Sequence, residues 1–219
     1  MDVKQPTDNS ACSGVASVIT SGNHTPGVSP NSMQQSNDNQ WFLMRVSYGR
    51  EKRVYDYLIE QGISVFYPTC EKVYEIGGKR KTRRDSLIPN MLFVFSSEES
   101  LKNYVGKDPY PYFHHFYCPH LDSKGQSIGS GKKPIIIPDS QMESFIQWYN
   151  VESEDKLMSS SSFQFKADDL VRVADGPFAG FEGHVIRYKG QTRVCVNIDA
   201  VGFIATAYIP KAYLIKIEQ

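Results

Sequence analysis

The distribution of apolar and polar residues divides the chain into a polar start and two regions with regular patterns. Residues 1–40 contain no aromatic residue and are rich in Ser, Asn, Gln, Gly and Pro. Such a segment buries too little apolar surface to offset the entropy lost on ordering, so we expect a disordered leader. Regular patterns begin at Trp41.

Residues 41–150 alternate between strand and helix patterns. The apolar run at 41–46 predicts a buried strand. Residues 50–61 show the spacing of an amphipathic helix, with Glu51 among the outward polar positions, and Gly62 is a suitable stop.

A long hairpin is predicted next. We expect strands at 64–76 and 87–95, because both stretches are rich in β-branched and aromatic residues. Between them, five of the six residues 79–84 are Lys or Arg, directly after a Gly77-Gly78 turn. The pattern therefore predicts an apolar strand with a cationic loop tip before it.

The remaining elements complete an α+β pattern. Ser97 is a suitable cap for a short helix, and 110–118 has the composition of an aromatic strand. Residues 123–133 are rich in Gly, Ser and Lys and are expected to form a loop, and a capped helix follows from Ser140. This order predicts a four-stranded antiparallel sheet with flanking helices over residues 41–150.

A second domain is predicted after a linker. Residues 151–162 are polar and end in four serines, as in a flexible linker. Residues 163–219 then contain some five short strand patterns separated by turns, which indicate a small all-β barrel of the SH3-like kind.

Charge and composition restrict the partners. The 24 Lys and Arg balance 24 Asp and Glu, so any contact with nucleic acid must come from a local patch. The four cysteines are scattered and form no C-x-x-C pair, which favours reduced thiols in a cytoplasmic protein. No stretch approaches the roughly 20 apolar residues of a membrane span, and the start lacks the features of a secretory signal.

Candidate chemistry is sparse. His114, His115, His120 and Cys118 are close in sequence, but adjacent residues of a strand point to opposite faces and do not easily share one ion. No glycine-rich phosphate loop is present, and Cys70 has no local base. We therefore expect no metal, no cofactor and no enzymatic activity.

Several motifs together resemble the NusG family of transcription elongation factors. Residues 169–173 with 176–185, which contain Gly176, Gly180 and Gly183, resemble the KOW motif, whose turn needs positive φ and close backbone approach. Upstream, Trp41-Phe42-Leu43, Gly49-Arg50-Glu51, Gly78-Lys79-Arg80 and Pro89-Asn90-Met91-Leu92-Phe93-Val94 resemble the family's amino-terminal domain. The resemblance covers about residues 41–218 and is close to specialised paralogues of the RfaH and UpxY type.

The resemblance implies a monomeric transcription elongation and antitermination factor that binds RNA polymerase and acts on selected operons, such as those for surface polysaccharide. An apolar patch would bind the polymerase clamp helices, through Phe42, Ile88, Met91 and Phe93. A second polymerase lobe would be touched by the pair Lys102 and Asn103.

Further contacts are implied for the rest of the chain. The basic tip would touch DNA or nascent RNA through Lys79, Arg80, Lys81, Arg83 and Arg84, although a merely solvated tip is an open alternative. The KOW domain would bind a ribosomal protein or a termination factor, with Phe178 and Phe181 exposed at its loop.

A ribosome-associated KOW protein that binds rRNA or a ribosomal protein is the alternative. Such a protein is expected to be strongly basic, whereas residues 163–219 hold seven Lys and Arg against six Asp and Glu. A KOW adaptor that only links proteins is a further alternative.

Overall fold

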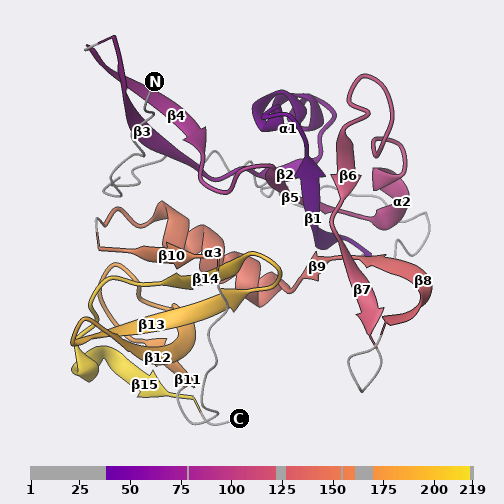
Figure 1. The fold of residues 1–219 in the computed structure, drawn as a ribbon. Coiled ribbons are helices and arrows are strands. Elements are labelled where there is room, and N and C mark those ends of the chain that lie inside the picture. The colour runs from indigo at the N-terminus through magenta and orange to yellow at the C-terminus, as the bar shows by residue number, and fades with distance from the viewer. Residues whose placement is uncertain (1–37, 78, 122–126, 154, 161–169, 218–219) are drawn as a thin grey trace, which may run out of the picture. The chain divides into compact units, whose positions relative to one another are not determined.

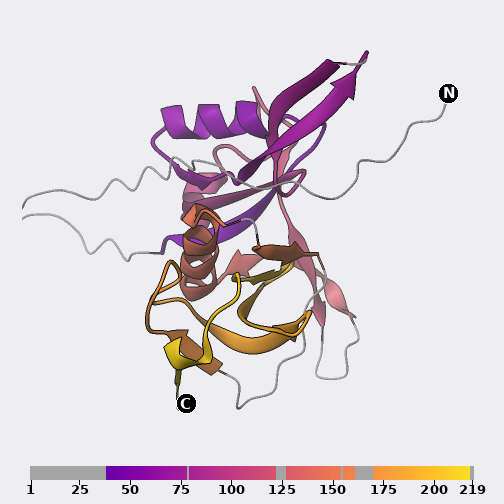
Figure 2. The same ribbon diagram turned by 90° about the vertical axis from the view of Figure 1, so that its left-hand side faces the viewer.

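A computed structural model describes residues 38–77, 79–121, 127–153, 155–160 and 170–217 (Figures 1 and 2). The predicted leader lies outside these residues except for its last three positions, and Gln40 already belongs to the first strand. Within the described ranges, no helix is long and apolar enough to cross a membrane.

The elements follow one another along the chain in this order: β1 Gln40–Val46, α1 Glu51–Glu60, β2 Ser64–Phe66, β3 Thr69–Ile76, β4 Lys79–Ser86, β5 Met91–Ser96, α2 Glu98–Leu101, β6 Phe113–His115, β7 Tyr117–Leu121, β8 Ser127–Pro134, β9 Ile136–Ile137, α3 Asp139–Asn150, β10 Leu157–Ser159, β11 Leu170–Val173, β12 Glu182–Tyr188, β13 Gln191–Ile198, β14 Gly202–Ala205, a 3₁₀ turn at Lys211–Tyr213, and β15 Leu214–Lys216.

Two compact units can be separated, and they do not follow chain order. One unit includes Pro89–Asp139 and the described residues up to Tyr67, and therefore holds β1, β2, β5 and β6. The other includes Pro68–Ile88 and Ser140–Gln219, and therefore holds the β3–β4 hairpin and the C-terminal strands.

An antiparallel sheet forms the centre of the first unit, in the order β2-β5-β1-β6, with β9 also paired to β1. The α+β prediction for this region is confirmed, but the expected four strands are five. Strand β1 has seven residues, whereas its neighbour β6 has only three. The part of the edge of β1 that β6 does not reach pairs with β9 instead, through Trp41 and Ile137.

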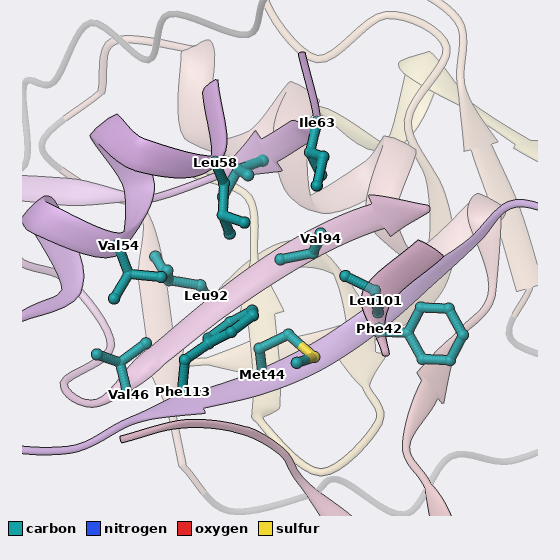
Figure 3. Packing of buried hydrophobic residues seen from close by; sticks show 11 residues of the cluster. Phe42, Met44, Val46, Val54, Leu58, Ile63, Leu92, Val94, Leu101 and Phe113 are labelled. Carbon is teal, nitrogen blue, oxygen red and sulfur yellow. The ribbon is translucent and has the colours of Figure 1, made fainter. Parts of the chain in front are cut away.

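The core of this unit lies on one face of the sheet, under α1 (Figure 3). Val54 and Leu58 of α1 are buried there with apolar residues of the strands, among them Phe42, Met44, Leu92, Val94 and Phe113. The predicted outward position of Glu51 is wrong, because this side chain is only 5% exposed. Its carboxylate accepts the backbone N–H of Asn90 at 2.7 Å, which satisfies the charge in its buried position.

The predicted cationic loop tip is also wrong, because the basic residues form a strand. β4 pairs with β3 over eight residues each, from Thr69↔Ser86 to Ile76↔Lys79. Figure 1 shows the pair as a long ribbon. The expected strand at 87–95 consequently begins only at Met91, after a bend in which Asn90 has a φ of 64°.

The segment after α2 differs from the prediction in two places. The aromatic stretch 110–118 is divided between β6 and β7, with Phe116 between them. Part of the predicted loop at 123–133 is strand β8, which pairs antiparallel with β7. The predicted Ser97 cap is confirmed, since its hydroxyl accepts the N–H of Ser100 at 3.2 Å.

The second unit contains a six-stranded antiparallel sheet in the order β10-β14-β13-β12-β11-β15. Five of these strands match the short strands expected after residue 163, and the sixth, β10, lies inside the predicted linker. Helix α3 contacts this sheet, because the indole N–H of Trp148 donates to the carbonyl of Ala205 at 2.8 Å (Figure 2). The boundaries of the domains and the KOW barrel remain predictions.

Candidate functional site

Strand register separates the four residues of the predicted apolar patch. Successive side chains of a strand point to opposite faces, so Phe42 lies on the α1 face with Val94, its cross-strand partner. Met91 and Phe93 point to the other face of the sheet. Ile88 belongs to the other unit. The register therefore places Phe42 on the opposite face of the sheet from Met91 and Phe93.

Burial corrects the patch further. Phe42, Ile88 and Phe93 are 2%, 8% and 0% exposed, so the expectation that they form an accessible surface is wrong. The physical reason is that β5 is apolar on both faces and both faces are buried along its middle. Of the four predicted residues, Met91 alone is partly exposed.

Accessible side chains do occur on the sheet face that carries Met91. Arg45 is the cross-strand partner of Met91 and is exposed, and Trp41 is the partner of Phe95, with both rings partly exposed. The rings of Trp41 and Phe95 lie 5.3 Å apart between centroids. We call Trp41, Arg45, Met91 and Phe95 the outer-face patch. It consists of two accessible pairs of mixed apolar and cationic character, separated on this face by the buried pair Leu43 and Phe93.

The predicted second contact is accessible. Lys102 and Asn103 follow the last residue of α2 directly, and both are exposed. Ser97 caps the start of this short helix, which fixes the position of the two side chains at its end.

The basic residues of the hairpin are all accessible. Lys79, Arg80, Lys81, Arg83 and Arg84 occupy β4, whose first six residues are exposed. Since they lie on a paired strand rather than in a loop, the ladder with β3 fixes the direction of each side chain.

One polar cluster is built into this hairpin. Asp85 accepts hydrogen bonds from the Tyr74 hydroxyl and from Nε of Arg83, the latter at 2.5 Å. The bond from Arg83 is the main reason that the pKa of Asp85 lies below its ordinary value, while the bond to Asp85 raises the pKa of Tyr74. The carboxylate is thus held ionised and the phenol protonated.

Two of the predicted turn glycines, Gly176 and Gly180, lie in the loop before β12, and the third, Gly183, lies in β12 itself. Gly176 and Gly180 have φ values of 86° and 84°, the left-handed region that glycine tolerates best. At Gly183 a Cβ atom would come within 2.5 Å of the Cys195 carbonyl oxygen, so this position needs close backbone approach instead.

The aromatic residues of this loop are not where the sequence suggested. Phe178 and Phe181 are 2% and 0% exposed, with ring centroids 6.0 Å apart, so the prediction that they are exposed is wrong. The glycine turns fold the loop back on itself, because Gly180 donates its N–H to the Val173 carbonyl and Phe181 donates to that of Phe178.

Sequence reasoning missed one exposed arrangement. The Arg50 guanidinium lies 5.6 Å from the ring centroid of Tyr48 and 4.7 Å from that of Tyr112. Tyr48 is 80% exposed and has a φ of 69°. Tyr112 is distant in sequence, so the only local signal is the turn Tyr48-Gly49-Arg50 at the end of β1.

Groups that could catalyse a reaction are buried or dispersed. Across the described ranges, no three His, Cys, Asp or Glu residues are placed to hold a metal ion. Burial raises the pKa of the Cys195 thiol to about 12, and Cys70 is also buried, so neither is an accessible thiolate. A cleft of about 660 Å³ beside α3 is lined mainly by polar residues of α3, β12 and β13.

Comparisons with known proteins agree with the arrangement of the first unit. Residues 39–146 match the family described as "Transcription termination factor nusG". The chain is 21% identical over 174 residues to the transcription termination/antitermination protein NusG of Lactococcus lactis, covering 75% of this chain and 86% of that protein.

A second relative gives the same result. The chain is 24% identical over 173 residues to the transcription termination/antitermination protein NusG of Thermus thermophilus, covering 73% of this chain and 89% of that protein. Both similarities extend well beyond a single motif. Together with these two similarities, the match shows that residues 39–146 form a domain of the NusG family.

Proposed function

We propose that the chain is a transcription elongation and antitermination factor that binds RNA polymerase and suppresses pausing or termination. The observation that carries this proposal is the NusG match over residues 39–146, which covers the sheet with the outer-face patch. In this proposal the protein acts by binding its partners and carries out no chemical step.

The outer-face patch is the surface we assign to the polymerase clamp helices. Met91 keeps the role that the sequence suggested, with Arg45 opposite it at one end of the patch. Trp41 and Phe95 form the other end, and the buried pair Leu43 and Phe93 lies between the two ends on the same face. The buried Phe42 and Phe93 support the sheet and do not themselves contact the polymerase. A flexible thioether at one end and two aromatic rings at the other suit the apolar part of an interface.

Two further contacts complete the proposal. Lys102 and Asn103 would touch a second polymerase lobe, to which their exposure at the end of α2 is suited. The C-terminal sheet would act as a KOW domain that recruits a ribosomal protein or a termination factor. Its contact surface excludes the rings of Phe178 and Phe181, which are buried.

The setting of this activity is part of the same proposal. The protein would work in the cytoplasm as a monomer, on selected operons such as those for surface polysaccharide. Its resemblance to RfaH-type and UpxY-type paralogues supports this choice of operons.

Capture of the host's core RNA polymerase tests the proposal. Wild type is compared with Arg45→Glu, which reverses an exposed charge opposite Met91 in the outer-face patch. Lys52→Glu is the matched control, because it reverses another exposed charge, on α1 rather than on the sheet. We expect polymerase capture by wild type and Lys52→Glu, and strong loss of capture by Arg45→Glu with an unchanged circular dichroism spectrum.

Two results would contradict the proposal. Equal capture by all three proteins would remove the outer-face patch from the interface. Retention of ribosomes but not polymerase by wild type would favour the ribosome-associated alternative.

A further inference from the structure

The predicted linker 151–162 contains a strand that covers one edge of the C-terminal sheet. β10 pairs antiparallel with β14 through three residue pairs, the first of which is Leu157↔Ala205 (Figure 1). In the order β10-β14-β13-β12-β11-β15, β10 is the terminal strand, so it occupies the edge that β14 would otherwise present. We call Lys156 and β10 together the strap.

The strap also covers an apolar cluster on one face of this sheet. Ile186, Cys195 and Ala205 are buried there, and the half-buried Leu157 and Phe203 pack against them. Leu157 lies opposite Ala205, which in turn lies opposite Cys195, so the three side chains are neighbours across three strands. The Cys195 side chain is therefore adjacent to a residue that the strap supplies.

Lys156 fastens the strap to the end of α3. Its ammonium group donates to the carbonyls of Trp148 at 2.8 Å and Tyr149 at 3.1 Å, and also to that of Val151. It lies 4.7 Å from the centroid of the Trp148 ring. The last carbonyls of a helix lack partners within the helix, so one lysine here satisfies several of them.

Two further contacts hold the strap from the sheet side. The buried Arg193 of β13 donates to the carbonyl of Asp155, the residue before the strap, and to that of Thr206 at 2.9 Å. At the other end, a Cβ atom on Gly202 would collide with the carbonyl oxygen of Ser159. The sheet is thus shaped to accept a backbone at this edge.

The strap is nevertheless the weakest strand of the sheet. Its strand has three residues, all half-buried, whereas the central strand β13 has eight. The other five strands pair with one another without it. A short edge strand with few buried contacts opens locally at a lower free-energy cost than the sheet to which it is attached.

We propose that the strap is autoinhibitory: closed, it blocks the edge of β14 and the apolar cluster, and open, it leaves both to an extended strand of a partner protein. The partner strand then takes the place of β10. This inference rests on the proposed function in one respect, namely that the C-terminal sheet recruits a partner.

The contacts of β10 indicate what the partner strand carries. In strand addition to a sheet edge, backbone hydrogen bonds supply affinity and alternate side chains supply specificity. The position opposite Ala205 takes an apolar side chain, as Leu157 does. Two residues later, opposite Phe203, a small residue such as Ser159 lets the backbone approach Gly202.

Alkylation of Cys195 in the full chain measures opening of the strap, with each thiol followed separately by mass spectrometry of its peptide. Leu157→Asp opens the strap by placing a charge beside the apolar cluster. Ser160→Asp is the matched control, because it adds the same charge at an exposed position just after the strap. Cys70, buried on β3, reports general unfolding.

We expect Leu157→Asp to raise the alkylation rate of Cys195 about ten-fold, and Ser160→Asp to raise it less than about two-fold. The Cys70 rate should stay at the wild-type value in both. Lys156→Gln is a second opening variant that places no charge beside the cluster, and it should raise the Cys195 rate about three-fold. Unchanged Cys195 rates, or equal rises of Cys195 and Cys70 in both opening variants, would overturn the proposal.

A synthetic peptide copying residues 153–160 tests strand replacement. At about millimolar concentration, similar to the effective concentration of a tethered segment, it should restore slow Cys195 alkylation in Leu157→Asp. The same peptide carrying Leu157→Asp should not. Failure of the first peptide to protect Cys195, or equal protection by both peptides, would contradict replacement of β10 by a second strand.

Failure of this inference can be separated from failure of the proposed function. Arg45→Glu should leave the Cys195 rate unchanged while it removes polymerase capture, because Arg45 lies on β1 and not beside the strap. Leu157→Asp should still capture polymerase. A strap that opens and accepts the peptide, in a wild type that captures no polymerase, would support the inference and contradict the proposed function.

Discussion

The β1–β5 pair and the β3–β4 pair are both antiparallel ladders, but they use their faces in opposite ways. In β1–β5, apolar side chains occur on both faces and the middle of each strand is buried. In β3–β4, most side chains are charged, and the residues of β4 up to Arg84 are all exposed. In β1–β5, burial makes predicted contact residues such as Phe42 and Phe93 inaccessible. In β3–β4, the register decides which cations lie opposite a carboxylate and which do not.

This difference shows which properties of a strand can be predicted from its sequence and which require knowledge of its pairing with a neighbouring strand. A strand that is apolar throughout does not show which of its residues face solvent, so Phe93 and Met91 could not be told apart before the structure. A charged strand shows its composition at once. Only the partner strand reveals that Arg84 is matched by Glu71 and Lys81 is not matched by a carboxylate.

The largest expected effect is on stability in the buried pair. Phe93→Ala removes a fully buried ring and should lower the free energy of unfolding by about 3–5 kcal/mol. Val73→Ala on the hairpin, where the side chain is 62% exposed, should change it by less than about 0.5 kcal/mol. Urea unfolding measures both, and similar values for the two variants would contradict the contrast between the pairs.

A smaller effect is expected at the turn that enters β5. Glu51→Ala leaves the N–H of Asn90 without its acceptor and should cost about 1–3 kcal/mol of unfolding free energy. Lys52→Ala, one residue further along α1 and exposed, should cost less than about 0.5 kcal/mol. Equal costs in thermal or urea unfolding would show that the buried carboxylate does not stabilise this turn.

The buried sheet should contribute a pH dependence near neutral pH through His115. His115 is 8% exposed, and burial is the main reason that its pKa lies below 6.5, with Glu98 opposing the shift. The unfolded chain then binds a proton that the folded chain does not, so stability is complete above about pH 6.5 and falls as the pH drops towards the lower folded value.

The comparison of wild type with His115→Gln isolates this effect. The unfolding free energy of the variant should decrease less between about pH 7.5 and 5.5 than that of wild type, because the titrating group is gone. Parallel pH profiles for the two proteins would exclude His115 as the source.

The smallest expected effect is on the hairpin. Asp85→Asn removes the carboxylate that lies on the same face of the hairpin as Lys79, Lys81 and Arg83. It should tighten the predicted contact of these cations with DNA a few-fold, with little change in unfolding free energy. Glu75→Gln, on the opposite face, is the control and should have less influence on affinity. A larger gain in DNA affinity from Glu75→Gln would place the predicted contact on the opposite face of the hairpin.

Much of the fold followed from local patterns. The helix at α1, the Ser97 cap and the five C-terminal strands were predictable because their signals lie within a few residues of one another. The strand β9 and the strand character of Lys79–Ser86 were not, because each depends on a partner elsewhere in the chain.

The candidate site was predictable only in part. The basic run and the exposed pair Lys102 and Asn103 could be found from the sequence, since charged residues are usually accessible. The burial of Phe178 and Phe181 could not, because the same aromatic residues in a glycine-rich loop are equally compatible with exposure. The place of Arg50 between Tyr48 and Tyr112 depends on a contact between distant segments.

The central proposal is that this chain, which contains a NusG-family domain, changes the behaviour of RNA polymerase through the outer-face patch. Single-round transcription by the host's polymerase on a template with a known pause and terminator tests it most directly. The account predicts that wild type and Lys52→Glu shorten the pause and raise read-through, whereas Arg45→Glu does neither. Unchanged pausing and read-through with wild type, while the protein sediments with ribosomes, would contradict it.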